Sequence, residues 1–497
     1  MIFKPCNTKL WDTFILPNNG TFYLFYLQCR NNYWDGYGLA ISSDLLNWVD
    51  MGTVLDLGPG SGTGMVYHTG VQWILSFCKM PPGERHHIGF ARSHDLVQWE
   101  LLPEEYDLYP DAQWYDAAFP GRTSSRFGDL WVEPKQGGGF IGFLTASALD
   151  GPAGANGVIG MAESTDGLHW HALPPASRPC GIGWMEFASH VEMNSRHYAL
   201  VGSNSGLGCR FDTVYNPTGK AGGMYVMASE QIEGPYEMVG GNAMLLGCRN
   251  APPNWAYIPT YYMRAFRLGD RMLVNHHWLP REDFTDAWLG TCKELREERP
   301  GMLALYWWQG NDNLKGDRIF DISCNPELCL PMSYELPTGK WRCGVDGLSL
   351  ETESTALVYS PTPCLETGVV VDAKLRFEGD GAGGLFFGND KLDDKNPFDG
   401  EAFLINARGL AEFGTVKFGI CGPVFMPENS VEWPVKNGEV MDIRLLVKGE
   451  FAEAYIDGKL VQCFGFSRPI TSHIGLFAEC GCVAAEALSA YWFSIAK

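Results

Sequence analysis

An eleven-residue pattern, G-x-A-x-S-x-D-x-x-x-W, recurs three times in the first part of this 497-residue chain. The copies are Gly38, Ala40, Ser42, Asp44 and Trp48, then Gly89, Ala91, Ser93, Asp95 and Trp99, then Gly160, Ala162, Ser164, Asp166 and Trp170. The small and apolar residues before each serine are typical of a β-strand, and the aspartate caps a turn by bonding nearby backbone N–H groups. Five fixed positions in three copies predict a fold built from repeated β units.

A second recurrence places an acidic residue ahead of a strand, a turn and another strand. Asp12 lies eight residues before Gly20, and Asp129 lies eight residues before Gly137. Glu186 stands at the corresponding distance from Asn194. Units of this kind begin near residues 12, 60, 129, 186 and 258, which predicts a five-bladed β-propeller over residues 1–312.

The propeller prediction brings the three acids together. The first strand of each blade lines the central channel, so residues that begin these strands lie at one mouth of it. Asp12, Asp129 and Glu186 are therefore expected to converge from three blades. Two other acids stay open as substitutes, because Glu133 lies four residues after Asp129 and Glu192 lies on the strand of Glu186.

The C-terminal third carries a different pattern. Residues 313–350 are rich in turn formers and predict an irregular connector. Over residues 351–497 apolar and polar residues alternate, as in Val371 to Glu378, and Asp457-Gly458 is typical of a two-residue hairpin. This part predicts an antiparallel β-sandwich, either a glycan-binding module or a structural support for the propeller.

Charge and sequence composition limit the partners. The chain has 37 Lys and Arg against 58 Asp and Glu, a net charge of -21. Such a surface repels phosphate backbones and anionic lipid, so neither nucleic acid nor membrane is an expected partner, whereas a small neutral molecule is. No leader-like or membrane-spanning apolar run is present, which favours a cytoplasmic protein. Cysteine and histidine spacings predict no metal and no cofactor, and a homodimer stays open.

Short motifs resemble glycoside hydrolase family 32, the β-fructofuranosidases and levanases, whose fold is a five-bladed propeller followed by a β-sandwich. Trp11-Asp12 with the later Tyr23 to Tyr26 strand and Gln28 resembles the family's W-x-N-D-P-N-G and F-Y-Q motifs. Ser61-Gly62-Thr63 resembles its S-G-S segment, and Glu453 to Gly458 resembles a sandwich motif. Gly128-Asp129 falls where the family has R-D, and Glu186-Phe187 falls on E-C.

The resemblance implies an exo-acting, retaining glycosidase that acts on a small carbohydrate. Asp12 would be the nucleophile, Glu186 the general acid/base and Asp129 the transition-state stabiliser. The residues that flank all three acids depart from the family's motifs, which puts the sugar in doubt. Two alternatives remain: an inverting pentosidase like those of glycoside hydrolase family 43, and a catalytically silent carbohydrate-binding propeller.

Residues expected to hold the sugar are aromatic or polar and lie on loops or strand ends near the channel mouth. Arg122 or Arg126 is the nearest cation that could replace the arginine missing beside Asp129. The full set of expected substrate-binding residues is Gln28, Trp34, Asp35, Ser61, Trp114, Asp116, Arg126, Trp184, Asn275, His276 and Trp278.

Overall fold

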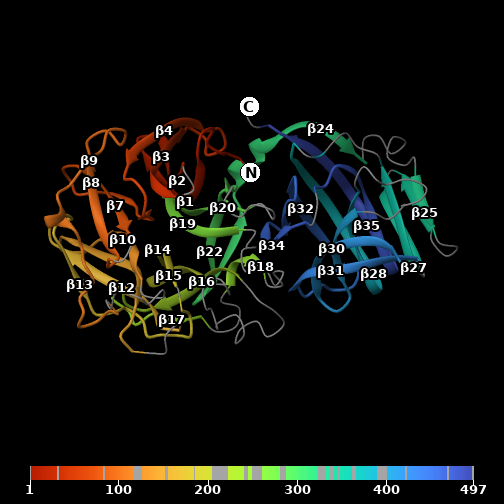
Figure 1. Cartoon of the computed structure of the whole chain (residues 1–497). Coiled ribbons are helices and arrows are strands. Elements are labelled where there is room, and N and C mark those ends of the chain that lie inside the picture. Colours follow the sequence, from red (N-terminus) through yellow and green to blue (C-terminus); the bar gives the residue numbers. More distant parts are fainter. Residues whose placement is uncertain are drawn as a thin grey trace. The chain divides into compact units, whose positions relative to one another are not determined.

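A computed structural model of the chain forms two compact units (Figure 1). The first consists mainly of residues 1–247, 251–279 and 283–305, and the second mainly of residues 306–497. The structure describes residues 2–30, 33–81, 84–116, 126–150, 155–183, 185–203, 222–239, 244–248, 260–279, 287–322, 332–335, 340–344, 346–360, 365, 367–388, 400–419, 422–466 and 469–494.

The first unit is the predicted five-bladed propeller, whose blades follow one another along the chain. Blade I holds β1 (Lys9–Asn18), β2 (Thr21–Cys29), β3 (Trp34–Ser42) and β4 (Val49–Asp56). Blade II holds β5 (Ser61–Gly62), β6 (Val66–His68), β7 (Trp73–Lys79), β8 (His87–Ser93) and β9 (Glu100–Leu101), before the 3-10 helix η1 (Glu104–Tyr106). Blade III holds β10 (Phe127–Pro134), β11 (Phe140–Ser147), β12 (Gly157–Ser164) and β13 (Trp170–Leu173).

The last two blades keep the same antiparallel order. Blade IV holds β14 (Glu186–Met193), β15 (Arg196–Ser203), β16 (Gly222–Ser229), β17 (Glu237–Met238) and β18 (Met244–Cys248). Blade V holds β19 (Thr260–Leu268), β20 (Arg271–Trp278), β21 (Trp288–Leu289) and β22 (Lys293–Arg299), and β23 (Met302–Trp307) follows.

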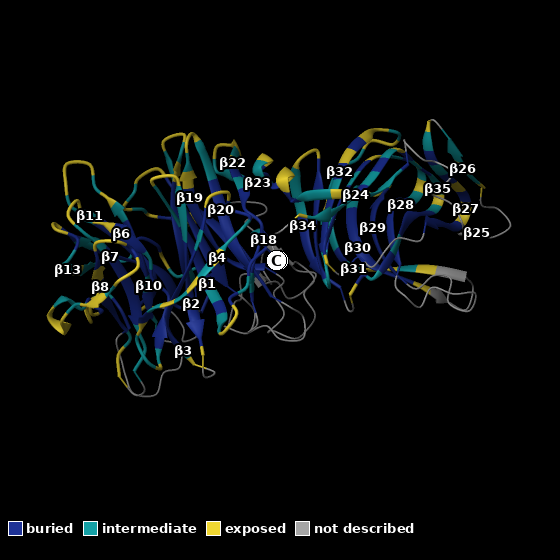
Figure 2. Ribbon diagram, turned by 90° about the horizontal axis from the view of Figure 1, so that it is seen from above, coloured by how far each residue is buried: buried dark blue, intermediate teal, exposed yellow. Residues whose placement is uncertain are grey.

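The hydrophobic core of the propeller lies between neighbouring blades. Phe25 and Leu39 of blade I pack in one cluster with Leu75 and Phe77 of blade II. Equivalent clusters join blade II to blade III and blade III to blade IV. Figure 2 shows the result, with buried strand centres and exposed residues mostly at the turns. Burial of apolar faces between blades is what holds the repeated sheets together.

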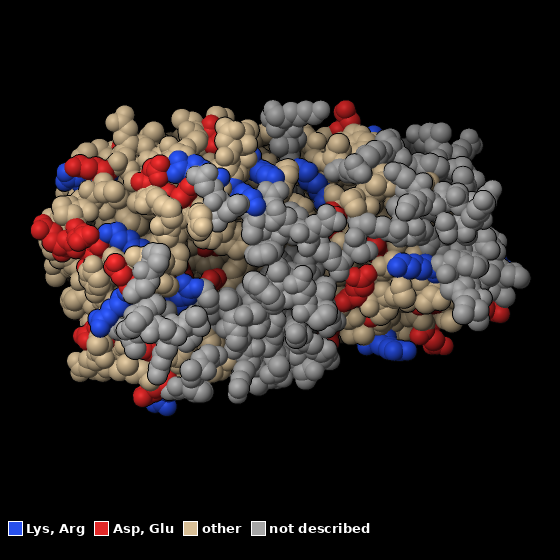
Figure 3. Space-filling view, viewed as in Figure 1, with Lys and Arg blue, Asp and Glu red and all other residues tan. Residues whose placement is uncertain are grey.

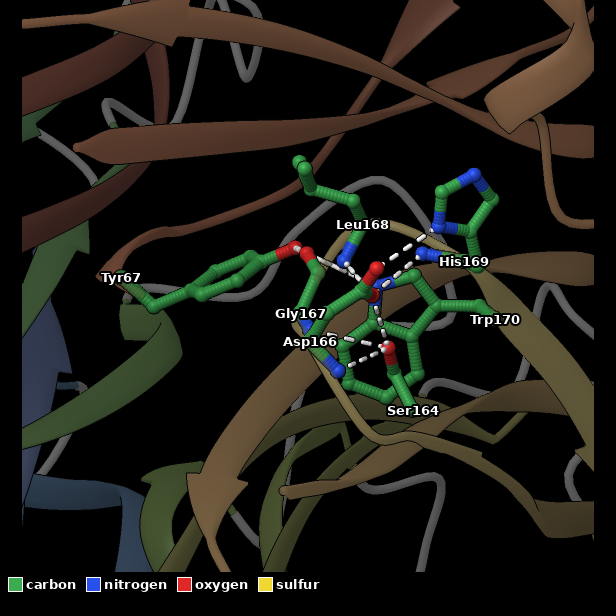
Figure 4. A network of polar contacts seen from close by, with 7 residues as sticks. All are labelled: Tyr67, Ser164, Asp166, Gly167, Leu168, His169 and Trp170. Carbon is green, nitrogen blue, oxygen red and sulfur yellow. Dashed lines mark hydrogen bonds and ion pairs between the residues drawn. The ribbon is translucent and has the colours of Figure 1, made fainter. Parts of the chain in front are cut away.

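The repeated corner has the same hydrogen bonds in all three copies, and Figure 4 shows the copy in blade III. In blade III, Ser164 Oγ accepts from the backbone N–H of Gly167 at 2.9 Å, and Asp166 Oδ1 accepts from those of Leu168 and His169 at 2.8 and 2.9 Å. Trp170 Nε1 donates to the Gly167 carbonyl oxygen at 3.3 Å. The corners at Asp44 and Asp95 repeat these bonds, which explains why the serine, aspartate and tryptophan recur.

The inner strands carry a β-bulge at matching places. The register of β1 shifts between Trp11 and Phe14, and that of β10 shifts between Gly128 and Trp131. Strands β14 and β19 shift in the same way. Asp12 and Asp129 adopt left-handed backbone conformations at these bulges, with φ of 38° and 56°. Bulges re-aim side chains, and strained backbone is often retained at functional sites.

The second unit is the predicted antiparallel sandwich. It holds η3 (Gln309–Leu314), β24 (Lys315–Asp321), β25 (Met332–Glu335), β26 (Lys340–Gly344), β27 (Gly347–Ser360), β28 (Val369–Gly388), β29 (Gly400–Asn406), β30 (Leu410–Gly419), β31 (Gly422–Glu432), β32 (Val440–Lys448), β33 (Phe451–Ile456), β34 (Lys459–Gly465) and β35 (Ser472–Phe493). Val371, Leu375 and Phe377 of β28 face its core. The Asp457-Gly458 turn joins β33 to β34, with φ of 51° and 77° at its two residues.

The segment expected as an irregular connector carries strands. Within residues 313–350, β24 pairs with β35, and β25 and β26 pair with β27. These strands belong to the sheet system of the sandwich. Their pairing partners lie as far away in the sequence as Phe493 is from Lys315, so the local turn-forming composition gives no sign of these strands.

Charged residues of both signs are interspersed over the described surface drawn in Figure 3. On the described part of that face neither sign of charge forms one continuous block. None of the helices in the described part of the chain is long and apolar enough to span a bilayer.

Candidate active site

A cavity of about 380 Å³ in the propeller collects all three acids predicted from the sequence. Its walls come from blades I to IV. The lining residues are Trp11, Asp12, Leu27, Trp34, Gly62, Thr63, Cys78, Met80, His86, Arg126, Phe127, Gly128, Asp129, Thr145 and Glu186. The convergence that the repeat register predicted is therefore present.

Asp12 lies at the bulge of β1 and is buried, with 8% of its surface exposed. Thr63 of blade II donates its hydroxyl hydrogen to Oδ2 of Asp12. The other oxygen, Oδ1, has no hydrogen-bond partner among the described residues. Burial and the neighbouring Glu186 raise the pKa of Asp12 well above its ordinary value, while the Thr63 bond opposes that rise.

Asp129 lies at the bulge of β10 and is bonded by Thr145 of β11. The Thr145 hydroxyl donates to Oδ2 of Asp129 at 2.6 Å and accepts from the backbone N–H of Phe187 at 2.7 Å. One side chain thus links Asp129 to the residue that follows Glu186. Burial raises the pKa of Asp129, and the Thr145 bond and two arginines act against the rise.

The residue before Asp129 is a glycine because its neighbour leaves no room for a side chain. A Cβ on Gly128 would lie 2.8 Å from the Sγ atom of Cys78. An arginine beside the aspartate, as in the resembled motif, therefore does not fit here. Arg126, two residues before Gly128 and directly before β10, lines the cavity and supplies a cation there.

Glu186 begins β14 and receives a hydrogen bond from blade V. The Tyr261 hydroxyl donates to Oε2 of Glu186 at 2.5 Å. Burial and the charge of Asp129 raise the pKa of Glu186 to about 7, against the opposing effects of Tyr261 and Arg126. Carboxyls crowded in one cavity cannot all ionise, so this set can donate a proton from one group while another carries negative charge.

Two tryptophans form an aromatic wall beside Asp12. The rings of Trp11 and Trp34 stack with centroids 5.4 Å apart and an interplanar angle of 30°. His86 also lines the cavity, and burial with the nearby Arg126 lowers its pKa to about 4, so the imidazole is neutral near pH 7. An aromatic wall with a few polar groups suits a small polar ligand that has an apolar face.

Of the eleven expected substrate-binding residues, the structure places Trp34 and Arg126 in the cavity wall. Gln28 is fully buried and accepts a hydrogen bond from Thr53 at 3.0 Å. Asp35 forms an ion pair with Arg30, and Ser61 is buried next to the lining residue Gly62. None of these three is among the described lining residues.

The other expected residues lie elsewhere. Trp114 packs against the hydrophobic core between blades II and III. Asp116 is buried, and its backbone N–H donates a hydrogen bond to the carbonyl oxygen of Ser147 at 2.8 Å. Trp278 contacts Trp288, with ring centroids 6.3 Å apart. None of these is among the described lining residues. Trp184 and Arg122 lie outside the described residues.

Asn275 and His276 of blade V face in opposite directions. Asn275 Nδ2 donates to Thr13 O at 2.9 Å and thereby ties β20 to β1 beside Asp12. His276 faces Lys293, whose Nζ lies 2.6 Å from Nε2. The next residue, His277, turns back toward blade I, with its ring centroid 4.4 Å from that of Trp11.

The two substitute acids do not line the cavity. Glu133 Oε1 accepts from Trp131 Nε1 at 2.8 Å and contacts His190 Nδ1 at 3.2 Å. Glu192 is exposed near the far end of β14. The described cavity therefore contains the set that the repeat register predicts, Asp12, Asp129 and Glu186.

Several residues that act on the acids were not selected from the sequence. Thr63, Thr145 and Tyr261 each donate a hydrogen bond to one of the acids, namely to Asp12, Asp129 and Glu186 in that order. The positive charge of Arg264 lowers the pKa of Asp12 and of Asp129. Tyr261 and Arg264 belong to the inner strand of blade V, whose bulge matches those of Asp12 and Asp129. That shared register is the signal that could have found them. No group of three or more metal-ligating side chains occurs in the described part of the chain.

The fold is that of known family 32 glycoside hydrolases. The GH32 β-fructofuranosidase of Bombyx mori superposes with a TM-score of 0.65 at 13% identity, over 99% of this chain and 94% of that one. The fructan 1-exohydrolase IIa of Cichorium intybus superposes with a TM-score of 0.65 at 14% sequence identity, over 100% of this chain and 97% of that one. The sucrose-6-phosphate hydrolase of Lactobacillus gasseri superposes with a TM-score of 0.60 at 16% sequence identity, over 98% of this chain and 91% of that one. No protein-family model and no curated protein sequence matches the chain.

Proposed function

We propose that the protein is a glycoside hydrolase that removes a terminal sugar from a small oligosaccharide or glycoside. The observation that carries this proposal is the meeting of Asp12, Asp129 and Glu186 in one cavity, with the pKa of Glu186 raised to about 7. Glycosidic cleavage requires one protonated and one ionised carboxyl across the scissile bond. A general acid is most effective when its pKa lies near the working pH.

Each acid receives one role. Glu186 donates its proton to the leaving oxygen and then takes a proton from the attacking water. Asp12 attacks the anomeric carbon through Oδ1, the oxygen that no described residue bonds, while Thr63 holds Oδ2. Asp129, fixed by Thr145, accepts hydrogen bonds from sugar hydroxyls and supports the positive charge of the oxocarbenium-like transition state.

We further propose a β-fructofuranosidase-like, exo-acting and retaining enzyme. The fold supports the sugar class, and a cavity of about 380 Å³ is at the small end of ligand sites, which favours terminal residues of short substrates. The Trp11 and Trp34 wall would stack against the sugar ring. The departures around Asp129 and Glu186 favour a sugar that differs in detail from those of the resembled family.

A substrate panel tests the proposal. Sucrose, kestose and nitrophenyl fructosides, arabinosides and xylosides are incubated with the wild type, Glu186→Gln, Asp12→Asn and the matched control Glu192→Gln, an exposed residue of the same strand. Turnover that is lost in the first two variants and kept in the control supports the hydrolase. Turnover confined to pentosides with inversion favours the family 43-like alternative. Sugar binding without any turnover would refute the enzyme proposal in favour of a silent binding propeller.

A further inference from the structure

One threonine hydroxyl connects two of the three acids in the cavity. Thr145 lies on β11 of blade III, where it pairs with Gly128 directly before the bulge at Asp129, and 2% of its surface is exposed. It is one of the residues that line the cavity. Its hydroxyl oxygen lies 2.6 Å from Oδ2 of Asp129 and 2.7 Å from the backbone nitrogen of Phe187 in blade IV. The hydroxyl therefore joins Asp129 to the residue that follows Glu186.

The direction of these two hydrogen bonds follows from the hydrogens available. A backbone N–H can only donate, so the Thr145 oxygen accepts from Phe187. The hydroxyl has one hydrogen, and Asp129 Oδ2 is the acceptor within hydrogen-bond distance of it among the described residues. A buried hydroxyl hydrogen without an acceptor is costly, so this hydrogen goes to Oδ2. The separation of 2.6 Å is typical of a hydroxyl that donates to an ionised carboxylate.

The backbone of Phe187 is held by side chains at both its N–H and its carbonyl group. Thr145 of blade III accepts from the N–H, and the Tyr262 hydroxyl of blade V donates to the carbonyl oxygen at 3.0 Å. Strand β14 has its bulge directly after Phe187, where the regular ladder is interrupted and such bonds take its place. Because Glu186 is covalently bonded to the Phe187 nitrogen, the Thr145 hydroxyl also fixes where Glu186 lies relative to Asp129.

We propose that Thr145 is a positioning residue for two acids: its hydroxyl keeps Oδ2 of Asp129 a hydrogen-bond acceptor, and it holds the backbone that carries Glu186. Any proton that Asp129 takes up is thereby directed to Oδ1. The catalytic consequence rests on the proposed function, whereas the hydrogen bonds do not. In that function Asp129 supports positive charge while Glu186 reaches the leaving oxygen, and a misplacement of about 1 Å at such a site costs about 100-fold in rate.

Several groups besides Thr145 act on the ionisation of Asp129. Burial raises the pKa of Asp129, and the Thr145 hydrogen bond is the largest influence that lowers it. The titratable and charged groups that interact with Asp129 are Asp12, Tyr37, Cys78, Arg126, Glu186, Tyr262 and Arg264. A substitution at Thr145 leaves all of them in place.

The test compares two variants without the hydroxyl, Thr145→Val and Thr145→Ala, with Thr145→Ser, which keeps it. Two such variants are used so that a folding failure of one leaves the test intact. The matched control is Thr69→Val, which removes a hydroxyl that donates to the carbonyl oxygen of Gln72 at 3.1 Å, away from the described cavity lining. The first readout is the pH titration of Asp129 by infrared absorption of protonated carboxyl groups, assigned with Asp129→Asn, which needs no turnover. The second is kcat and KM on a substrate of the wild type.

Without the donor, the ionised form of Asp129 is less stable, so its carboxyl should titrate about one pH unit higher in Thr145→Val and Thr145→Ala. The same two variants should lose about tenfold or more in kcat with a smaller change in KM, because the acids are displaced in the transition state as well as in the bound state. Thr145→Ser should return both quantities close to the wild-type values, and Thr69→Val should leave them unchanged.

Three results would separate the possible outcomes. Hydroxyl-free variants that melt earlier but titrate like the wild type would show a purely structural role and overturn the inference, as would a folded Thr145→Ser that titrates like Thr145→Val. A raised Asp129 titration with unchanged kcat would overturn the positioning role. A raised titration in a protein that turns over no substrate would uphold the hydrogen bond to Asp129 and refute only the proposed function.

Discussion

The hydrogen bond between Tyr261 and Glu186 gives a quantitative prediction. The Tyr261 hydroxyl donates to the Glu186 carboxylate at 2.5 Å, which stabilises the ionised form and lowers the pKa that burial raises. Tyr261→Phe removes this donor and keeps the ring. A hydrogen bond to a charged group contributes roughly 1.5–3 kcal/mol, and each pKa unit corresponds to about 1.36 kcal/mol. Because Glu186 borders the cavity, we expect a rise of about one unit from its value of about 7.

The rise should be visible in the alkaline limb of the rate profile. If Glu186 is the general acid, kcat/KM falls as pH rises through its pKa, so the limb of Tyr261→Phe should lie about one unit above that of the wild type. Sugar release is measured from a substrate with a poor leaving group, because proton donation then limits the rate. Tyr236→Phe is the matched control, since the Tyr236 hydroxyl donates to the backbone oxygen of Ile232 at 3.0 Å. An alkaline limb that stays in place, or moves to lower pH, would refute the reasoning.

Three further predictions address stability and binding. Because the pKa of Glu186 is raised from 4.5 to about 7 in the folded state, the free energy of unfolding of the wild type falls as pH rises through that window. The free energy of unfolding of Glu186→Gln should therefore exceed that of the wild type by about 1–3 kcal/mol at pH 8 and match it at pH 4. Urea unfolding midpoints that are the same for both proteins at both pH values would contradict this. Asp166→Ala removes the acceptor of two backbone N–H groups and should lower the free energy of unfolding by about 1–2 kcal/mol in urea melts, whereas no loss would mean that the corner is dispensable. Trp34→Ala should raise KM about tenfold with little change in kcat, while Trp114→Ala, outside the cavity wall, should leave KM unchanged; the reverse result would remove the aromatic wall from substrate binding.

The architecture was predictable because its information is local. The bonds of the Asp44, Asp95 and Asp166 corners close within four residues, so each corner leaves the same pattern in the sequence. Matching positions near the start of the inner strands of three blades then sufficed to bring Asp12, Asp129 and Glu186 into one cavity. The propeller, the sandwich and the family 32-like fold are confirmed. The catalytic roles stay predictions.

The support around the acids was not predictable, because it comes from distant parts of the chain. Arg264 bonds Gly64, 200 residues earlier, and Tyr261 bonds Glu186 across 75 residues. Gly128 is explained only by the thiol of Cys78, which reaches it from the neighbouring blade. Strand β24 likewise depends on a partner strand at the end of the chain. Each of these contacts joins single residues that are far apart in the sequence, and such a contact leaves no repeated pattern from which it could be predicted.

The central claim is that Asp12 attacks the sugar while Glu186 supplies the proton. Mass spectrometry of the Glu186→Gln variant, quenched during turnover of a glycoside with a good leaving group, tests it most directly, because this variant can form a glycosyl intermediate but breaks it down slowly. The account predicts a single added glycosyl group on the peptide that contains Asp12, absent in the Glu186→Gln, Asp12→Asn double variant. A glycosyl group on another peptide, or product of inverted configuration with no adduct at any time, would contradict it.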